Sequence, residues 1–435
     1  MRAVAHALLS IWAPVRAFSE IRNLMRENIL NTLLTSILET HKDISDLVFL
    51  VGKPVQVESH GELHSYPDEL ASSILNPVQI EELANLLMDG IERLKRDLQE
   101  FGSCDCSYAI GCGRFRVNIF RQNGHHAIVM RKLNTAVPTL DELKLQPIFR
   151  QIIKEKTGIV FVTGATGSGK TTTLAAMLNE LNQTARVHVV TLEDPIEFLH
   201  PQCKSAFSQR ELGRDFPTFA AGLRSALRQA PKVILVGEIR DRETMEIALT
   251  AAETGHVVYT TLHTINAGQT INRVLGFFGK DEEKMVRERL ADTLRYVVSQ
   301  RLIPKVGGGR LMINEIMGSN LRTREMLMLG EGENRSFAEI IDASAQYGWR
   351  TFDRTLIDAY TQNLITEETA MIFATSRNKV RAGIDFAKKL AGVAEETGGI
   401  KMKLDIGPVD ADPVASVQPG NRKAPSVDFS LLATG

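Results

Sequence analysis

The sequence predicts an α/β protein in which a small α+β domain precedes a larger domain built on a parallel sheet. From residue 148 onward, short apolar strands alternate with helix-forming stretches, and glycine or acidic turns follow the strands. This alternation is typical of a parallel sheet with helices on both faces. Between residues 28 and 133 helices and short strands are mixed without that alternation, which indicates a separate α+β domain.

Hydrophobic patterning and turn residues place the expected elements in order. In the first domain they are an amphipathic helix around residues 29–38, strands at 47–51 and 54–57, a helix over about 80–94 and a strand at 114–120. Pro138 and Pro147 mark a linker over residues 134–147. In the second domain, residues 148–396, strands are expected at 159–163, 187–192, 233–236 and 257–261.

The two ends of the chain are expected to lie outside these domains. Residues 1–27 form an N-terminal extension whose arginines and apolar stretch loosely mimic a signal peptide, but Pro14 and Arg16 interrupt that stretch. We expect a leading helix there, or a true start at Met25. Residues 397–435 are rich in proline and glycine without periodicity, which predicts a disordered tail.

Composition narrows the class of function. With 435 residues, 51 Lys+Arg and 52 Asp+Glu, the chain carries a net charge of −1, which argues against nucleic acid as a partner. Four cysteines fit a reducing cytosol. No apolar run approaches the ~18 residues of a membrane span, so we expect membrane association only through partners.

A phosphate-binding loop follows the strand at residues 159–163. Its pattern is G-x-x-x-x-G-K-T, and the residues are Gly164, Ala165, Thr166, Gly167, Ser168, Gly169, Lys170 and Thr171, with Thr172 next in the following helix. The glycines let backbone N–H groups surround a phosphate, and the lysine reaches the β- and γ-phosphates. The Thr171 hydroxyl is the predicted Mg²⁺ ligand. The alternative is a glycine-rich turn that merely joins strand to helix.

Acidic and histidine residues follow the other strands at the same edge of the sheet, where ligands bind. Glu238 is the candidate base for an attacking water, because hydrolysis at a γ-phosphate needs a carboxylate to orient and deprotonate it. Glu193 and Asp194 are candidates for water positioning or the metal shell, and His263 for sensing the γ-phosphate. His256 is a further candidate. Taken alone, each could be a helix cap or a surface polar group.

Together these stretches resemble the conserved boxes of the secretion ATPase superfamily. Besides the phosphate loop, they are residues 191–198 (an Asp box), 233–241 (a Walker B segment), and 253–256 with 261–264 (a His box). Over roughly residues 28–381 the chain is most similar to the type IV pilus retraction (twitching motility) ATPases. Residues 45–47, 113–118, 307–310 and 315–317 add to the resemblance.

The resemblance implies a homohexameric ring in which a PAS-like N-terminal domain packs on the RecA-like ATPase domain of the next subunit. ATP with Mg²⁺ would bind between domains, and hydrolysis would turn an inner-membrane platform protein that returns pilins to the membrane. It also implies a cytoplasmic protein, peripheral to the inner membrane through its partners.

Arginines are expected to neutralise transition-state charge across an interface of such a ring. Arg114, Arg116 and Arg131 are candidate donors from the N-terminal domain, since the first two share one face of a strand and the third lies on the next strand. Arg224 and Arg228 match the family's arginines before Walker B and are expected in a helical stretch. Surface ion pairs are the alternative for all five.

Departures from the family pattern leave alternatives open. Residues 320–325 keep only a Leu-Arg core of the segment usual in retraction ATPases, which raises the option of an accessory retraction ATPase beside a second ring. A related secretion or conjugation ATPase is a further option. The absence of cysteine after Cys203 argues against the assembly motors, which carry a tetracysteine insert. The spacing of Cys104, Cys106 and Cys112 predicts ordinary thiols, not a zinc site.

Overall fold

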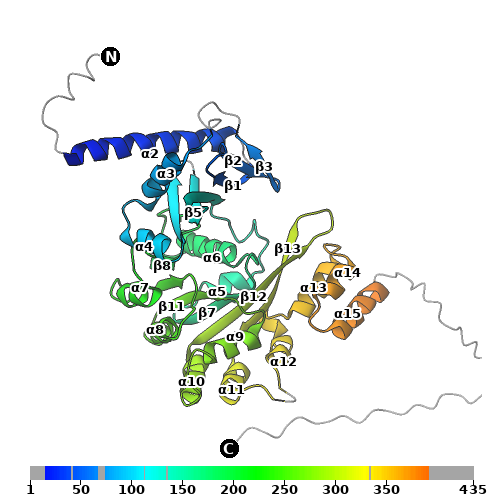
Figure 1. The fold of residues 1–435 in the computed structure, drawn as a ribbon. Coiled ribbons are helices and arrows are strands. Elements are labelled where there is room, and N and C mark those ends of the chain that lie inside the picture. Colours follow the sequence, from blue (N-terminus) through cyan, green and yellow to red (C-terminus); the bar gives the residue numbers. More distant parts are fainter. Residues whose placement is uncertain are drawn as a thin grey trace, which may run out of the picture. The chain divides into compact units, whose positions relative to one another are not determined.

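The computed structural model describes residues 15–40, 43–66, 74–111, 113–133, 136–332 and 335–390, and of residues 15–26 only the course of the backbone (Figure 1). The start of the expected N-terminal extension, the expected tail over residues 397–435 and Cys112 lie outside the described residues. Among the helices of the described ranges, none is long and apolar enough to cross a membrane.

An antiparallel sheet of six strands forms the N-terminal part, in the order β3-β2-β1-β6-β5-β4. Its strands are β1 (Ile44–Phe49), β2 (Gln56–Ser59), β3 (Glu62–Ser65), β4 (Ser103–Ile110), β5 (Gly113–Gln122) and β6 (His125–Leu133). Helices α2 (Val15–Thr40), α3 (Pro77–Met88) and α4 (Glu92–Glu100) accompany it. Alternate residues of β5, namely Phe115, Val117 and Ile119, are fully buried in its hydrophobic core.

Local turn chemistry corrects two expectations in this part. The single helix expected over residues 80–94 is wrong, because Asp89 (φ 46°) and Gly90 (φ 70°) adopt left-handed backbone that ends α3 before α4 begins. The strand expected at 54–57 begins only at Gln56, after Pro54, which has no N–H to give to a ladder. Helix α2 also runs without a break across the boundary expected between residues 27 and 28.

A seven-stranded sheet forms the second part, in the order β13-β12-β7-β11-β10-β8-β9. Its strands are β7 (Gly158–Thr163), β8 (His188–Glu193), β9 (Ala206–Glu211), β10 (Val233–Val236), β11 (Val257–Leu262), β12 (Leu294–Pro304) and β13 (Arg310–Gly318). The ladders from β9 through β12 are parallel, which is the arrangement predicted for β7, β8, β10 and β11. The strand β9 and the antiparallel hairpin of β12 and β13 were not among the predicted strands.

Helices cover this sheet and continue beyond it (Figure 1). They are α5 (Ile148–Ile152), α6 (Lys170–Thr184), α7 (Phe219–Ala226), α8 (Arg242–Glu253), α9 (Ala267–Leu275), α10 (Glu283–Thr293), α11 (Leu321–Leu329), α12 (Phe337–Asp342), α13 (Phe352–Thr361), α14 (Glu367–Phe373) and α15 (Arg377–Leu390). Residues 159–162 of β7 are fully buried at the centre of the main core. Phe352, Leu356, Val380 and Ile384 join a smaller core against β12 and β13. The domain boundaries at residues 133, 148 and 396 stay predictions.

Candidate functional site

The phosphate loop joins the central strand β7 to helix α6, and its glycines fit positions that other residues would strain. At Gly164 (φ 146°) a Cβ atom would lie 2.5 Å from both the Gln300 carbonyl oxygen of β12 and the Ser168 Oγ. Gly169 (φ 89°) is the N-cap of α6. The loop therefore presents the first N–H groups of α6 at the carboxyl end of the sheet, where they can bind phosphate.

Two polar side chains of the loop, Lys170 and Ser168, form no ion pair or hydrogen bond with an acidic side chain among the described residues. Lys170 Nζ donates hydrogen bonds to the carbonyl oxygens of Gly164 (2.8 Å) and Ala165 (3.1 Å). Burial lowers the pKa of Lys170, while the nearby charges of Glu238 and Glu197 oppose that shift. The buried Ser168 hydroxyl has no hydrogen-bond partner among the described residues. The Lys170 ammonium thus donates only to neutral carbonyl oxygens, and Ser168 Oγ has no partner in the described residues. Both groups are suited to bind the oxygens of a phosphate chain.

A cleft of about 530 Å³ opens over this loop. Of the predicted site residues, the following line it: Arg116, Thr166, Gly167, Gly169, Lys170, Thr171, Thr172, Glu193, Asp194, Glu238 and His263. Residues of β5, β8, β10, β11 and α6 thus line one cleft, and such clefts are expected at the carboxyl edge of a parallel sheet.

Glu238 follows β10, and its carboxylate lies between a guanidinium and an imidazole. Its Oε1 lies 2.5 Å from Arg240 Nη2, and its Oε2 lies 3.5 Å from Nε2 of His263. The carboxylate is largely buried yet reaches the cleft. Arg240 and His263 thus hold the carboxylate at the cleft, where it could accept a proton from an attacking water.

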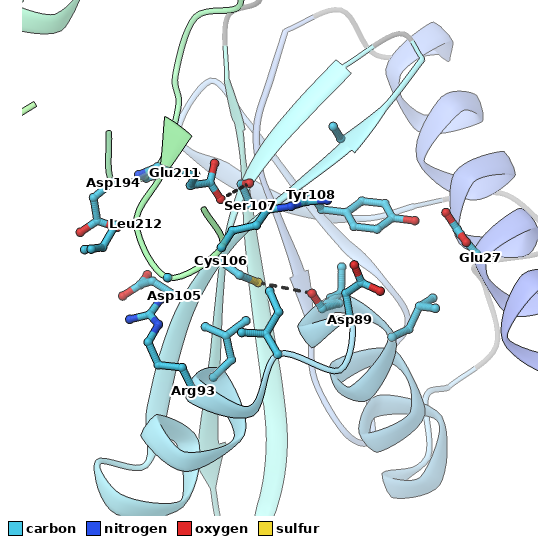
Figure 2. Close-up of a pocket in the computed structure, with 18 residues that line it drawn as sticks. Glu27, Asp89, Arg93, Asp105, Cys106, Ser107, Tyr108, Asp194, Glu211 and Leu212 are labelled. Atoms are coloured by element: carbon cyan, nitrogen blue, oxygen red, sulfur yellow. Dashed lines mark hydrogen bonds between the residues drawn. The ribbon is translucent and has the colours of Figure 1, made fainter. Parts of the chain in front are cut away.

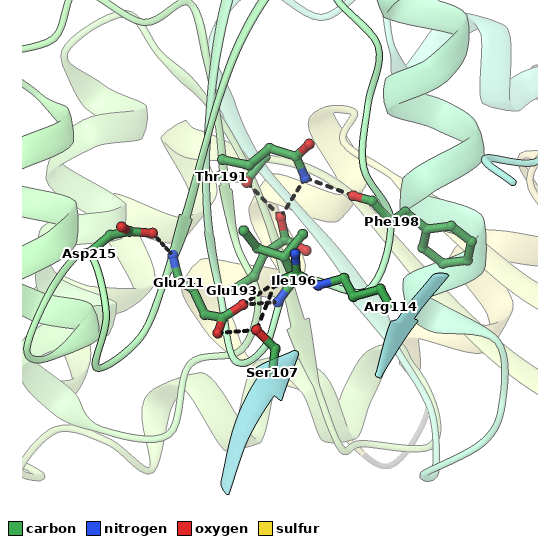
Figure 3. A network of polar contacts seen from close by, with 9 residues as sticks. Ser107, Arg114, Thr191, Glu193, Ile196, Phe198, Glu211 and Asp215 are labelled. Carbon is green, nitrogen blue, oxygen red and sulfur yellow. Dashed lines mark hydrogen bonds and ion pairs between the residues drawn. The ribbon is translucent and has the colours of Figure 1, made fainter. Parts of the chain in front are cut away.

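Glu193 is buried in the cleft wall, whereas Asp194, the next residue, is exposed at the cleft and only partly desolvated. Glu193 accepts hydrogen bonds from Thr191 Oγ1 (2.6 Å) and Gln209 Nε2 (3.2 Å), and burial raises its pKa to about 7 (Figure 3). Burial also raises the pKa of Asp194, against the opposing charges of Arg116 and Arg240. Two adjacent carboxyl groups with raised pKa values at a phosphate site suit water positioning or proton exchange.

The three arginines of the N-terminal part have different surroundings. Arg116 is partly exposed and lines the cleft. Arg114, two residues earlier, is buried, and its Nη2 lies 2.5 Å from Oε2 of Glu211 (Figure 3). Arg131 Nε pairs with Oδ1 of Asp46 at 2.9 Å, within the N-terminal sheet. Of the three, the structure brings only Arg116 to the cleft lining within the described residues.

The arginines before Walker B lie outside the cleft lining. Arg224 pairs with Glu243 at 2.6 Å, and Nη1 of Arg228 donates to the Arg224 carbonyl oxygen at 3.1 Å. The helix α7 ends at Ala226, so Arg228 follows the helix and does not share it as the sequence suggested.

His256 precedes β11, whereas His263 follows the same strand. The two histidines therefore lie at opposite ends of β11, and His256 is not brought to the cleft with its partner in the box. Its Nδ1 lies 3.0 Å from the Ala251 carbonyl oxygen at the end of α8.

Several residues that line the cleft were not among the predicted site residues: Glu197, Phe198, His200, Phe219, Arg240, Leu302 and Arg310. Glu197 forms a hydrogen bond with the Thr171 side chain and lies in the Asp box, so its place in the box was an available signal. Arg240 and Arg310 likewise belong to stretches that carried the resemblance. Phe198 and His200 gave no sequence signal, because their positions depend on how residues 194–205 turn between β8 and β9. Phe219 begins α7 and gave no signal either.

Cys104 and Cys106 are free thiols of β4. Burial raises the pKa of the Cys104 thiol to about 11 and that of Cys106 to about 12, which keeps both protonated near neutral pH. Within the described ranges, no group of three or more His, Cys, Asp and Glu side chains is arranged to hold a metal ion.

Comparison with known proteins identifies the family. Residues 110–348 match the family model described as "Type II/IV secretion system protein". The type IV pilus retractation ATPase PilT of Pseudomonas aeruginosa is 40% identical over 328 residues, which cover 75% of this chain and 93% of PilT. The type IV pilus ATPase PilU of the same organism is 35% identical over 380 residues, covering 86% of this chain and 96% of PilU.

A solved structure agrees with these matches. The crystal structure of the pilus retraction motor PilT with bound ADP superposes with a TM-score of 0.72 at 37% identity, covering 81% of this chain and 98% of the other. The complete phosphate loop, the acidic strand ends and this overall similarity agree with one another. The chain therefore belongs to the type II/IV secretion system family, the secretion ATPase superfamily, and within it to the type IV pilus retraction ATPases.

Proposed function

We propose that this chain assembles into a homohexameric ring and converts ATP hydrolysis into retraction of a type IV pilus, acting on an inner-membrane platform protein. That it is a pilus retraction or secretion ATPase follows from its family. The observation that supports a working motor most directly is Glu238, held between Arg240 and His263 in the same cleft as Lys170. The proposed place of action is the cytoplasmic side of the inner membrane, reached through partners and without nucleic acid.

In this proposal the residues of the cleft have separate roles in hydrolysis. The N–H groups of the loop and Lys170 bind the phosphates, and Glu238 accepts the proton of the attacking water. Thr171, beside Glu197, would hold Mg²⁺, which neutralises phosphate charge. His263 would sense the γ-phosphate beside Glu238, and Glu193 with Asp194 would orient the water.

Arg116 is the arginine that the cleft lining favours as a donor toward the developing negative charge. Arg131 remains a candidate only if it exchanges Asp46 for an acceptor on another subunit. The same holds for Arg224 with its partner Glu243, and for Arg228, whose guanidinium is exposed.

The proposal is tested by measuring ATP hydrolysis per chain against protein concentration, together with the mass of the assembly in solution. Turnover per chain should rise as a hexamer forms, and Glu238→Gln should abolish it while ATP binding persists. Glu283→Gln is the matched control, because Glu283 pairs with Arg287 on α10, away from the cleft. A monomer with full turnover would contradict the ring as the active form.

An accessory retraction ATPase is the second candidate, because residues 320–325 keep only the Leu-Arg core of the segment usual in retraction ATPases. Asn320 caps helix α11, and Thr323 beneath it is buried, so this segment is a well-formed structural element despite its altered sequence. An accessory subunit would bind ATP and form rings with little turnover alone, and turnover would rise when a principal retraction ATPase is added. High turnover of the isolated ring would exclude this role.

A further inference from the structure

The segment that follows β8 separates two cavities. Asp194 and Pro195 line the nucleotide cleft on one side and a smaller cavity of about 230 Å³ on the other. That smaller cavity is bordered by the N-terminal part through residues such as Arg93, Asp105 and Ser107 (Figure 2). The position of Asp194 in the cleft therefore depends on what holds the segment at its other face.

Glu211, the last residue of β9, binds the segment on the side of the smaller cavity. Its Oε2 accepts a hydrogen bond from the backbone N–H of Ile196 at 3.2 Å. The same oxygen accepts from Nη2 of Arg114 at 2.5 Å, and Oε1 accepts from Ser107 Oγ at 2.6 Å (Figure 3). One buried carboxylate thus binds both the segment of the nucleotide cleft and two residues of the N-terminal part.

Ser107, Arg114 and Glu211 form hydrogen bonds with one another, and Arg114 and Glu211 are buried. Arg114 Nη2 also donates to Ser107 Oγ at 2.9 Å, which completes a triangle with Glu211. The backbone of Glu211 is fixed by its N–H donating to Asp215 Oδ2 at 2.7 Å. In the turn that follows β9, the Arg93 guanidinium lies against Gly213. A Cβ atom at position 213 would lie 2.1 Å from Arg93 Nη2. Charge-assisted bonds in a buried site are strong and directional, so this carboxylate has little freedom to move.

We infer that Glu211 is a positioning residue: it fixes the Asp194–Ile196 segment through the Ile196 N–H and makes that position depend on the docking of Arg114 and Ser107. This inference rests on the proposed function, because it assigns Glu211 to the chemistry of the same cleft. It also gives Arg114 the role of holding Glu211 within its own chain, in place of a direct contact with phosphate.

Two double variants separate positioning from simple stability. Arg114→Met with Glu211→Leu removes the ion pair and the acceptor for Ile196 N–H, whereas Arg114→Met with Glu211→Gln removes the charges but keeps an acceptor oxygen. Replacing both partners of a buried ion pair avoids an unpaired buried charge, so both proteins are expected to fold. A third double variant, Arg287→Met with Glu283→Leu, removes an ion pair on α10 as the matched control.

The measurements are kcat and KM for Mg·ATP and the hydrogen exchange of the peptide containing Ile196, all in the full-length assembly. With the acceptor removed, kcat should fall at least about tenfold with KM changed less than about threefold, and the Ile196 amide should exchange faster. With glutamine at 211 the acceptor oxygen remains but Arg114 no longer holds it, so both effects should be smaller than in the leucine variant. In the α10 control, kcat and exchange should stay within about threefold of wild type.

Equal exchange and equal kcat for the leucine and glutamine variants, with similar unfolding midpoints, would overturn the inference. If the wild type does not hydrolyse ATP, the proposed function fails, and the exchange of the Ile196 amide still decides whether Glu211 positions the segment. If the leucine variant does not fold, Arg114→Met with Glu211→Met replaces it, since it also removes the acceptor for the Ile196 N–H, and unchanged exchange there would again count against the inference.

Discussion

Arg116 differs from Arg114 by two positions along β5 and has a wholly different environment. Both lie on the same face of the strand, but Arg114 is buried against Glu211 while Arg116 remains partly exposed at the cleft. Only an arginine whose guanidinium is not already committed to a buried carboxylate can move onto a phosphate without a large cost. At the scale of the residue, Arg116 is therefore the better donor.

Substitution of Arg116 tests this. Arg116→Gln should lower kcat by roughly a thousandfold, because an arginine that neutralises transition-state charge contributes at least that much to the rate. Arg121→Gln is the matched control, since Arg121 is exposed on the same strand and is outside the cleft lining. Steady-state ATPase assays compare them, and equal kcat values for both variants would remove Arg116 from the chemistry.

The raised pKa of Glu193 predicts the direction in which the free energy of unfolding changes with pH. An acid whose pKa is near 7 in the folded state and about 4.3 in the unfolded state keeps its proton longer when folded, so its ionisation lowers stability as pH rises between these values. The loss approaches on the order of 3 kcal/mol once Glu193 is fully ionised. Relative to Glu193→Gln, the wild-type free energy of unfolding should therefore fall from pH 5 to pH 8. Parallel urea-unfolding profiles of the two proteins over that range would contradict the assignment.

At the scale of the element, the phosphate loop depends on a strand far away in sequence. Thr163 Oγ1 of β7 and Ser299 Oγ of β12 are hydrogen-bonded at 2.9 Å, and the Gln300 carbonyl lies against Gly164. The loop conformation is thus set by β12 as well as by its own glycines.

A single methyl group at position 164 should disrupt this element. Gly164→Ala places a Cβ 2.5 Å from the Gln300 carbonyl oxygen at a φ of 146°, so the loop must shift and ATP affinity should fall at least about tenfold. Gly52→Ala is the control, since Gly52 also has a positive φ (82°) but open space around its Cβ position. ATP binding to each purified variant measures the difference, and equal affinities would show that the loop tolerates the shift.

The elements show which features the sequence could predict and which it could not. The phosphate loop and the strands before Glu193, Glu238 and His263 were predictable, because apolar runs and glycine motifs are local signals. The break between α3 and α4 was signalled by Asp89-Gly90 and was missed because the apolar periodicity continues across it. The pairing of Arg114 with Glu211 had no local signal, since the two residues lie on different sheets.

At the scale of the whole molecule, the cleft is built from residues between Arg116 and Arg310. Removal of residues 397–435 should therefore leave ATP hydrolysis unchanged, because every residue that lines the cleft precedes position 311. Turnover per chain of the truncated protein, measured at the concentration where the full chain assembles, is the test. A loss of more than about half would show that the tail contributes to assembly or to the chemistry.

The pairing of β7 with β12 also has a consequence for biosynthesis. The strand that carries the phosphate loop leaves the ribosome well before its neighbour, since Thr163 and Ser299 are 136 positions apart in the chain. A nascent chain that ends before β12 has the complete G-x-x-x-x-G-K-T motif and lacks the strand that supports Gly164. We therefore expect nucleotide to stabilise the newborn protein only after β12 has been synthesised.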